Sequence, residues 1–183
     1  AIYIRWSQIG ARDASWRFIS LVDGKQPMFT WVTMVLFRAM PTVDPLFVGR
    51  LTSVLAGFAS CIGIWFLARE VFKNHSVAWM ASLLYVLLPF TLMYDRMALY
   101  DSMVATFSVW NLYLALLLVR TLRLDVALVL GMVLGAGMLN KTSGFLTLYM
   151  LPLTLFLFDW RRNDRVARLL RWVALTFVAA ILS

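Results

Sequence analysis

Two short charged stretches between apolar runs carry residue types that bind phosphate. The stretch MYDRMALYDSM contains Asp95, Arg96 and Asp101, and the stretch LNKTSG contains Lys141. An arginine can grip a phosphate through two parallel N–H bonds. A lysine beside a helix start adds a point charge where backbone N–H groups also favour anions. The chemistry that these residues suggest is therefore the binding of a phosphate group near a membrane surface.

Asp101 and Lys141 each have a plain structural alternative, whereas Arg96 has none of this kind. Asp101 stands just before an apolar run, so either it or Ser102 could cap the start of a helix. Lys141 could simply extend toward lipid headgroups. If the stretch around them is helical, Arg96 and Asp101 lie roughly 140° apart around the axis and face different partners.

The composition is that of a membrane protein. Of 183 residues, 62% are hydrophobic and 14% charged, whereas soluble domains have about 45–50% and about 25%. The net charge of +8 comes from basic residues in short clusters between apolar runs, which is typical of topology signals and indicates no nucleic-acid partner. Cys61 is the only cysteine, so the chain can form neither an internal disulfide nor a cysteine metal site.

The apolar runs predict an all-α fold, a polytopic transmembrane helix bundle. A membrane helix needs about 20 apolar residues. Residues 1–45 are more polar and rich in Trp and Arg, which predicts extracytoplasmic interfacial helices before a bundle of residues 46–183. The predicted spans are residues 47–68, 76–94, 102–119, 124–140, 142–159 and 172–183, the last one truncated. Because the chain starts without Met and stops inside an apolar run, we expect a piece of a longer protein.

The distribution of Lys and Arg predicts which connections face the cytoplasm. The first, third and fifth connections are the more basic, so the positive-inside rule places them there. The charged stretches and the N-terminal segment then share the extracytoplasmic side. This side collects Lys25, Arg50, Arg96 and Lys141 together with Asp95 and Asp101. Ionisable groups at several span ends are a functional-site hypothesis, although each could also merely mark the end of a span.

Four motifs resemble one enzyme family. DGKQPMFTW is similar to a Lys-Pro-Pro segment followed by aromatics, and VGRLTSVLAG to an Arg-Leu-Pro-Ser helix start. RMALYD is similar to an Arg and an Asp five residues apart, and GAGMLNKTSG to a Gly-Leu-x-x-Leu-x-Lys-Gly turn. Together they resemble the GT-C class of membrane glycosyltransferases. Within this class, they resemble the phospholipid carrier-dependent branch, which contains protein O-mannosyltransferases and the bacterial aminoarabinose transferase of lipid A.

The resemblance implies an enzyme that moves a sugar from a polyprenyl-phosphate donor, with inversion, to a glycan, lipid or protein acceptor. The reaction would take place on the extracytoplasmic side of a bacterial inner membrane. By the motif matches, Lys25, Arg50, Arg96 and Lys141 would bind the donor phosphate. Asp101 would be the catalytic or acceptor-side carboxylate, with an acidic general base and basic phosphate ligands as the expected chemistry.

The chain departs from the family pattern at the lysine motif. Gln26 replaces the first proline, and Gly24 stands where some relatives carry an acidic residue, so a divalent metal site there is unsupported and no cofactor is assigned. The main catalytic acid of the family usually lies slightly upstream of a segment like IYIRWSQIGARD, which would fall before Ala1. Asp13 and Asp23 are the fallback candidates within the chain.

Two other classes of protein stay open. The chain could be a non-catalytic accessory or structural membrane subunit, or a degenerate relative that binds a lipid-linked sugar without transferring it. A transporter is the third alternative, but the charges gather at span ends and not at the bilayer midplane, where transporter sites commonly lie.

Overall fold

The computed structural model describes residues 2–158 and 164–183, and none of these residues forms a strand. The prediction of an all-α fold is confirmed. The α-helices are α1 (Ile2–Arg12), α2 (Met28–Ala39), α3 (Pro45–Phe72), α4 (His75–Leu87), α5 (Pro89–Asp95), α6 (Asp101–Thr121), α7 (Leu124–Asn140), α8 (Phe145–Met150) and α9 (Arg165–Leu182). Short 3-10 helices are η1 (Ala14–Trp16), η2 (Ile19–Asp23), η3 (Thr142–Gly144) and η4 (Leu151–Leu157).

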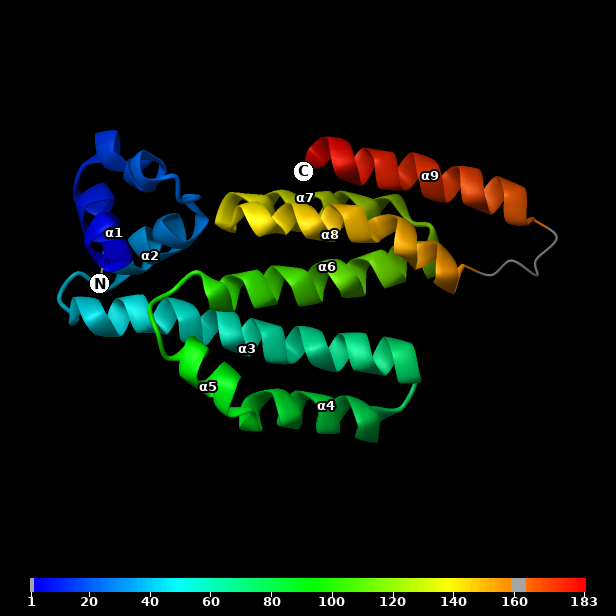
Figure 1. The fold of residues 1–183 in the computed structure, drawn as a ribbon, viewed down its shortest axis with the longest axis horizontal. Helices are drawn as coiled ribbons and strands as arrows, with labels where there is room; N and C mark the ends of the chain where they lie inside the picture. The colour runs from blue at the N-terminus through cyan, green and yellow to red at the C-terminus, as the bar shows by residue number, and fades with distance from the viewer. Residues whose placement is uncertain (1, 159–163) are drawn as a thin grey trace.

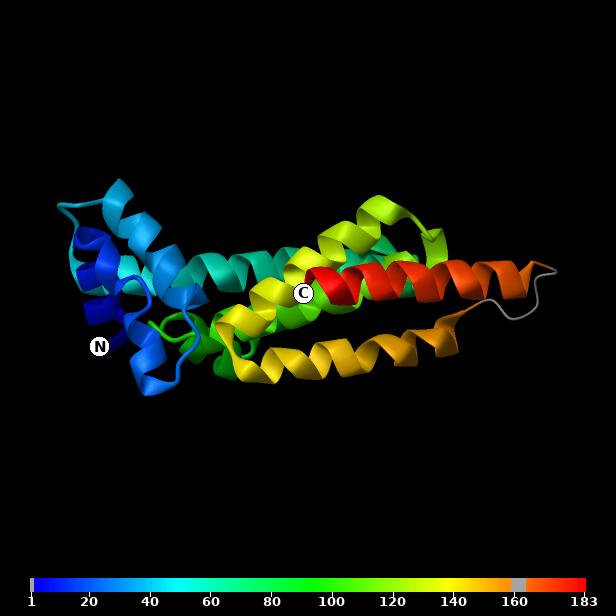
Figure 2. The same cartoon turned by 90° about the horizontal axis from the view of Figure 1, so that it is seen from above.

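The long helices run side by side, and the N-terminal helices α1 and α2 cover one end of this bundle (Figure 1, Figure 2). We call this end the cap end. The starts of α3 and α6 and the ends of α5 and α7 also lie there, because successive long helices run in opposite directions (Figure 1). The other end, which we call the distal end, holds the ends of α3 and α6 and the starts of α4, α7 and α9.

Helices α3 and α6 are long and apolar enough to cross a membrane, and α4 with α5 forms a third candidate bent by 65°. The bend follows from Pro89, which has no N–H and disfavours the helical conformation of the residue before it. Leu88 accordingly adopts φ −64° and ψ 123°, which is extended. At the start of α3, the Asp44 side chain accepts a hydrogen bond from the Phe47 N–H, and Pro45 occupies the first turn.

Small residues on α3 bring it close to α6. The hydroxyls of Ser60 and Thr106 lie 2.9 Å apart, and the Thr106 hydroxyl also donates to the Ala56 carbonyl. A Cβ added at Gly63 would lie 2.9 Å from Cγ1 of Val109. Small residues that let backbones approach are the usual basis of helix association in lipid, where apolar side chains supply no preference for protein over lipid.

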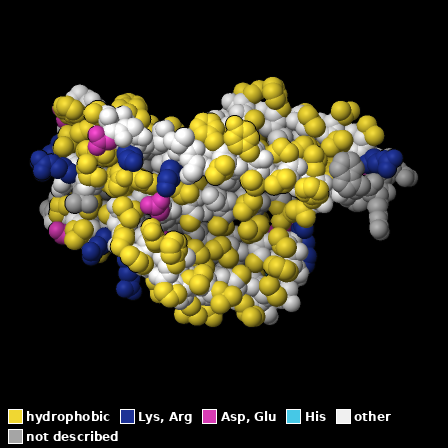
Figure 3. Space-filling model, viewed as in Figure 1, with side chains coloured by type: hydrophobic (Ala, Val, Ile, Leu, Met, Phe, Trp, Pro, Cys, Tyr) yellow, Lys and Arg dark blue, Asp and Glu magenta, His cyan; other side chains and the backbone are white. Residues whose placement is uncertain are grey.

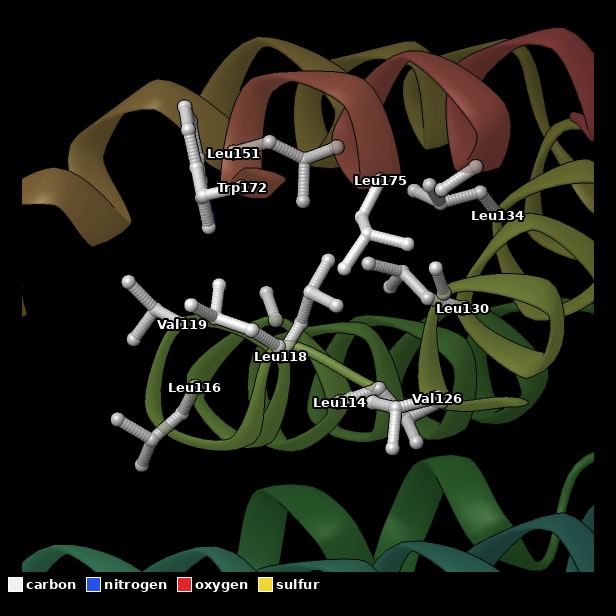
Figure 4. Packing of buried hydrophobic residues seen from close by; sticks show 14 of the residues in the cluster. Leu114, Leu116, Leu118, Val119, Val126, Leu130, Leu134, Leu151, Trp172 and Leu175 are labelled. Atoms are coloured by element: carbon white, nitrogen blue, oxygen red, sulfur yellow. The ribbon is translucent and has the colours of Figure 1, made fainter. Parts of the chain in front are cut away.

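A second core joins α6, α7 and α9 (Figure 4). Leu118, Leu130, Leu134 and Leu175 from these helices are buried and face one another (Figure 4). Helix α9 is therefore part of the bundle and not a separate unit.

The two C-terminal apolar segments differ from simple membrane helices. Residues 142–157 form η3, α8 and η4 instead of one α-helix. Helix α8 ends at Met150 because Pro152, in the first turn of η4, cannot continue the α-helical hydrogen bonds. The last helix begins at Arg165, and not at Trp172 where the apolar run starts. Hydropathy identified the apolar part of this helix and missed its basic first turns. Residue 159, the predicted end of the fifth span, lies outside the described residues.

The outer surface of the bundle is apolar. Figure 3 shows hydrophobic side chains over most of the visible face, with Lys, Arg, Asp and Glu gathered mainly toward the two ends. On α4 the exposed side chains include Trp79, Met80, Leu83, Leu84 and Leu87. A surface of this kind is expected to face lipid, and charged groups at both ends are expected to face water.

Candidate functional site

All five predicted site residues lie on elements that meet at the cap end. Lys25 follows η2, and Arg50 is in the second turn of α3. Arg96 ends α5, Asp101 begins α6, and Lys141 follows the last residue of α7. The fold therefore brings these residues to one end of the molecule, as their placement on alternate connections predicts (Figure 1).

The one direct contact among these five residues is an ion pair between Lys141 and Asp101. Nζ of Lys141 lies 3.0 Å from Oδ1 of Asp101 and 4.9 Å from the centre of the Tyr100 ring. Next to it, the Asn140 side chain donates a hydrogen bond of 3.1 Å to the Tyr100 carbonyl. The two charged side chains keep 40% and 36% of their surface exposed. The end of α7 is thus fixed on the start of α6, and the ion pair stays accessible to a ligand.

The capping alternatives for Asp101 and Ser102 are wrong as stated. The residue in the cap position of α6 is Tyr100, and no side chain makes a capping hydrogen bond there. The Asp101 carboxylate contacts Lys141 instead, although its place in the first turn still suits the helix dipole. The hydroxyl of Ser102 is buried and has no hydrogen-bond partner in residues 2–158 and 164–183.

Tyr3 extends the site into the N-terminal cap, and the sequence motifs did not reveal it. Its ring packs edge-on against Tyr100 at 5.2 Å and against Phe29 at 6.0 Å. Burial raises the pKa of the Tyr3 phenol, and the neighbouring Tyr100 hydroxyl and Asp101 carboxylate add to the shift. Helix α1 thereby contacts the residue immediately before Asp101.

The three other basic candidates are exposed and unpaired. Within the part of the chain that the structure describes, Lys25, Arg50 and Arg96 make no ion pair. Each of these cations is therefore free to bind an anion at the cap end.

Asp95 is a site residue of a different kind. The Tyr85 hydroxyl donates a hydrogen bond of 3.0 Å to its Oδ2 atom. The carboxylate also occupies the space beside Gly57, because a Cβ added at that glycine would lie 2.2 Å from Oδ2. Asp95 therefore joins α5 to α3 and α4, directly before Arg96. This role is visible only once the helices are packed.

Of the two fallback candidates for the catalytic acid, Asp13 caps a turn, and Asp23 has no hydrogen-bond or ion-pair partner for its side chain among the described residues. Asp13 accepts hydrogen bonds from the Ser15 N–H at 2.9 Å and the Ser15 hydroxyl at 2.8 Å. These bonds, the backbone one first, lower the pKa of Asp13 and make it a weaker base. Asp23 is exposed at the end of η2, before Gly24, whose φ of 67° requires glycine-like freedom. Among the described residues, no three His, Cys, Asp or Glu side chains gather as metal ligands.

The apolar bundle with charged residues at its ends defines a multi-pass integral membrane protein that has a polar site at the cap end. The sequence matches a family described as dolichyl-phosphate-mannose-protein mannosyltransferase over residues 24–183. The chain belongs to this family, and the resemblance to GT-C glycosyltransferases is confirmed. The matched range includes Lys25, Arg50, Arg96, Asp101 and Lys141. No curated protein and no solved structure gives a significant match.

Membership of this family implies glycosyl transfer that depends on a polyprenyl-phosphate sugar. It also implies a lipid-linked sugar donor and an acceptor as partners. The family match supports the enzyme class.

Proposed function

We propose that this protein transfers a sugar, with inversion, from a polyprenyl-phosphate donor to an acceptor at the extracytoplasmic face of a bacterial inner membrane. In this proposal the cap end is the extracytoplasmic end and holds the site. The observation that carries the proposal is the accessible ion pair of Lys141 and Asp101 at the end where Lys25, Arg50 and Arg96 are exposed. This arrangement offers cations for the donor phosphate and a carboxylate for the acceptor.

Donor binding would exchange the partners of Lys141. When the phosphate enters, Lys141 can bind it in place of the Asp101 carboxylate, so the cation keeps an anionic partner throughout. The released carboxylate can then accept a hydrogen bond from the acceptor hydroxyl. Arg96 would grip the same phosphate bidentately and stabilise the negative charge that the departing phosphate develops. Lys25 would also donate a charge-assisted hydrogen bond to this phosphate, and Arg50 would contribute at longer range.

The charges at the distal end support the proposed orientation. The first, third and fifth connections and their flanking turns carry Arg69, Lys73, Arg120, Arg123, Arg165, Arg168 and Arg171, whereas the corresponding positions at the cap end carry Arg38, Arg50, Arg96 and Lys141. The N-terminal segment adds Arg5, Arg12, Arg17 and Lys25 at the cap end, farther from the first span. Cytoplasmic connections carry an excess of Lys and Arg. With the distal end in the cytoplasm, the cap end faces the opposite side. This proposal also includes the six predicted spans and the position of the N-terminal helices at the membrane interface.

The test is transfer of radiolabelled sugar from polyprenyl-phosphate donors by the full-length protein in liposomes. Arg96→Ala and Lys25→Ala should each lower transfer by about tenfold or more, since a charge-assisted hydrogen bond contributes about 1.5–3 kcal/mol. Arg123→Ala is the matched control, because it removes an exposed cation at the distal end that pairs with Asp125, and transfer should stay at the wild-type rate.

Thermal stability should be the same in all three variants and the wild type. Unchanged transfer by Arg96→Ala would remove that residue from the site. A folded wild type that transfers no sugar from any donor would favour the non-catalytic subunit.

A further inference from the structure

An apolar groove lies between α3, α6 and the segment 145–157, away from the cap end. Its volume is about 420 Å³. The side chains that line it include Leu67, Phe72, Leu112, Leu116, Leu153 and Leu157. Of these, Phe72, Leu112, Leu153 and Leu157 are exposed on the outer surface, so the groove opens toward the lipid. The Thr154 hydroxyl also lines it, but it donates to the Leu151 carbonyl and offers no free donor.

The distal end of this groove is basic. On α6, Leu112, Leu116 and Arg120 are spaced four residues apart and share one side of the helix, so Arg120 continues the wall of the groove. Arg120 forms an ion pair with Glu70, and the same carboxylate binds Lys73. One carboxylate is thus shared by two cations, and one of these, Lys73, directly follows the groove residue Phe72.

A third cation reaches the same place from α9. The Arg168 guanidinium donates a hydrogen bond of 3.5 Å to the Arg120 carbonyl. It also lies 6.0 Å from the centre of the Phe158 ring, next to the groove residue Leu157. The groove therefore ends at three cations, Lys73 after α3, Arg120 on α6 and Arg168 on α9. Because Glu70 neutralises only one of them, this end of the groove has a net positive charge.

We propose that one anionic phospholipid of the bilayer occupies this site, with an acyl chain in the groove and its phosphate against Lys73, Arg120 and Arg168. The apolar groove alone would not select a lipid, because the surrounding tails are equally apolar. The charge complementarity selects an anionic headgroup, as basic pockets between membrane helices do. The lipid connects α3, α6 and α9, and it lies at the end of the bundle opposite the proposed sugar-transfer site.

Lipid binding to the purified full-length protein tests this proposal. Native mass spectrometry in detergent would compare phosphatidylglycerol with phosphatidylcholine of the same acyl chains. Each Lys or Arg near the surface strengthens the binding of anionic lipid by roughly fivefold. We therefore expect the double variant Lys73→Gln and Arg168→Gln to lower phosphatidylglycerol affinity by about 30-fold. Phosphatidylcholine should bind weakly to both proteins.

Two further variants separate the contribution of the lipid headgroup to the affinity from that of the acyl chain. Arg123→Gln removes a cation at the same end that pairs with Asp125, and its phosphatidylglycerol affinity should match the wild type. Leu153→Trp places a larger side chain in the groove and should weaken phosphatidylglycerol binding while leaving the cations in place.

Three results would overturn the proposal. The first is equal binding of the two lipids by the wild type. The second is an equal loss of affinity in Arg123→Gln and in the double variant. The third is displacement of phosphatidylglycerol by polyprenyl phosphate, with loss of that competitor's binding in the double variant, because the groove would then hold the donor lipid.

Discussion

Replacing Gly57 with alanine would place a methyl group against the Asp95 carboxylate. The added Cβ would lie 2.2 Å from Oδ2 and 2.5 Å from Cγ of Asp95. Neither distance can be accommodated, so the carboxylate must move away from α3. That movement also breaks the hydrogen bond from the Tyr85 hydroxyl. The substitution therefore disturbs the contact that joins α5 to the bundle immediately before Arg96.

The expected cost has three contributions. Extra volume at a packed site costs about 1–3 kcal/mol, and loss of a hydrogen bond to a charged group costs about 1.5–3 kcal/mol. Alanine in a helix interior offsets about 1 kcal/mol of this relative to glycine. We expect Gly57→Ala to lower the free energy of unfolding by about 1.5–5 kcal/mol.

Gly137→Ala is the matched control, because it makes the same chemical change in α7 with more room. Its Cβ would lie 3.3 Å from Cβ of Phe107 and 3.7 Å from the Asn111 amide nitrogen. This variant should be as stable as the wild type or more stable by up to about 1 kcal/mol. Reversible unfolding by SDS in mixed micelles measures both values on the full-length protein.

The double variant Gly57→Ala and Asp95→Ala tests the cause. With the carboxylate removed, the methyl group has space, so Gly57→Ala should cost little in that background. The coupling free energy should therefore be close to the whole loss in Gly57→Ala alone, about 1.5–5 kcal/mol. If Gly57→Ala is as stable as Gly137→Ala, or if the two changes at Gly57 and Asp95 are additive, the proposed contact between α3 and α5 is refuted.

Other features of the cap end and the bundle lead to further predictions. A double-mutant cycle of Lys141→Ala and Asp101→Asn should give a coupling of only about 0.2–1 kcal/mol in the SDS assay, because both side chains are more than one-third exposed. A larger coupling would contradict their accessibility. The raised pKa of Tyr3 favours its neutral phenol in the folded state, so its contribution to stability is complete below pH 10 and declines as the pH rises above that ordinary value. Tyr3→Phe should make the alkaline decline in unfolding titrations smaller, and a decline of unchanged size would show that Tyr3 does not contribute to it. Asn111→Leu should change the free energy of unfolding by less than about 1 kcal/mol, because its 3.4 Å hydrogen bond to Thr147 is long and such bonds contribute little in membranes. A loss well above that value would show that the amide is essential to the packing of α6.

Composition and hydropathy were sufficient to predict the all-α membrane fold, since each apolar run can satisfy its backbone only as a helix. They were insufficient where the backbone deviates within an apolar run. Residues 76–93 appear continuous in hydropathy, yet Pro89 divides them into two helices bent by 65°. Helix α8 ends at Met150 for a related reason, since Pro152 interrupts the α-helical hydrogen bonds.

The site was predictable in its location and not in its contacts. Helices that cross in alternating directions bring every second connection to the same end, so the grouping of Arg96, Asp101 and Lys141 follows from the order of the spans. The ion pair of Lys141 with Asp101 depends on how α7 is rotated against α6, which residue types alone do not determine. The contact of Asp95 with Gly57 has the same origin.

The bend at Pro89 also has a consequence for how the protein enters the membrane during synthesis. Helix α4 has 13 residues and α5 has seven, and each alone is shorter than the roughly 20 residues that cross a bilayer. Their carbonyl groups at the bend are satisfied partly by the Thr91 hydroxyl, which donates to the carbonyls of Tyr85 and Leu88. Asp95 needs Gly57 on α3 and Tyr85 on α4 to be accommodated. We therefore expect α4 and α5 to become stable in the lipid phase only together with α3, which supplies the space beside Gly57.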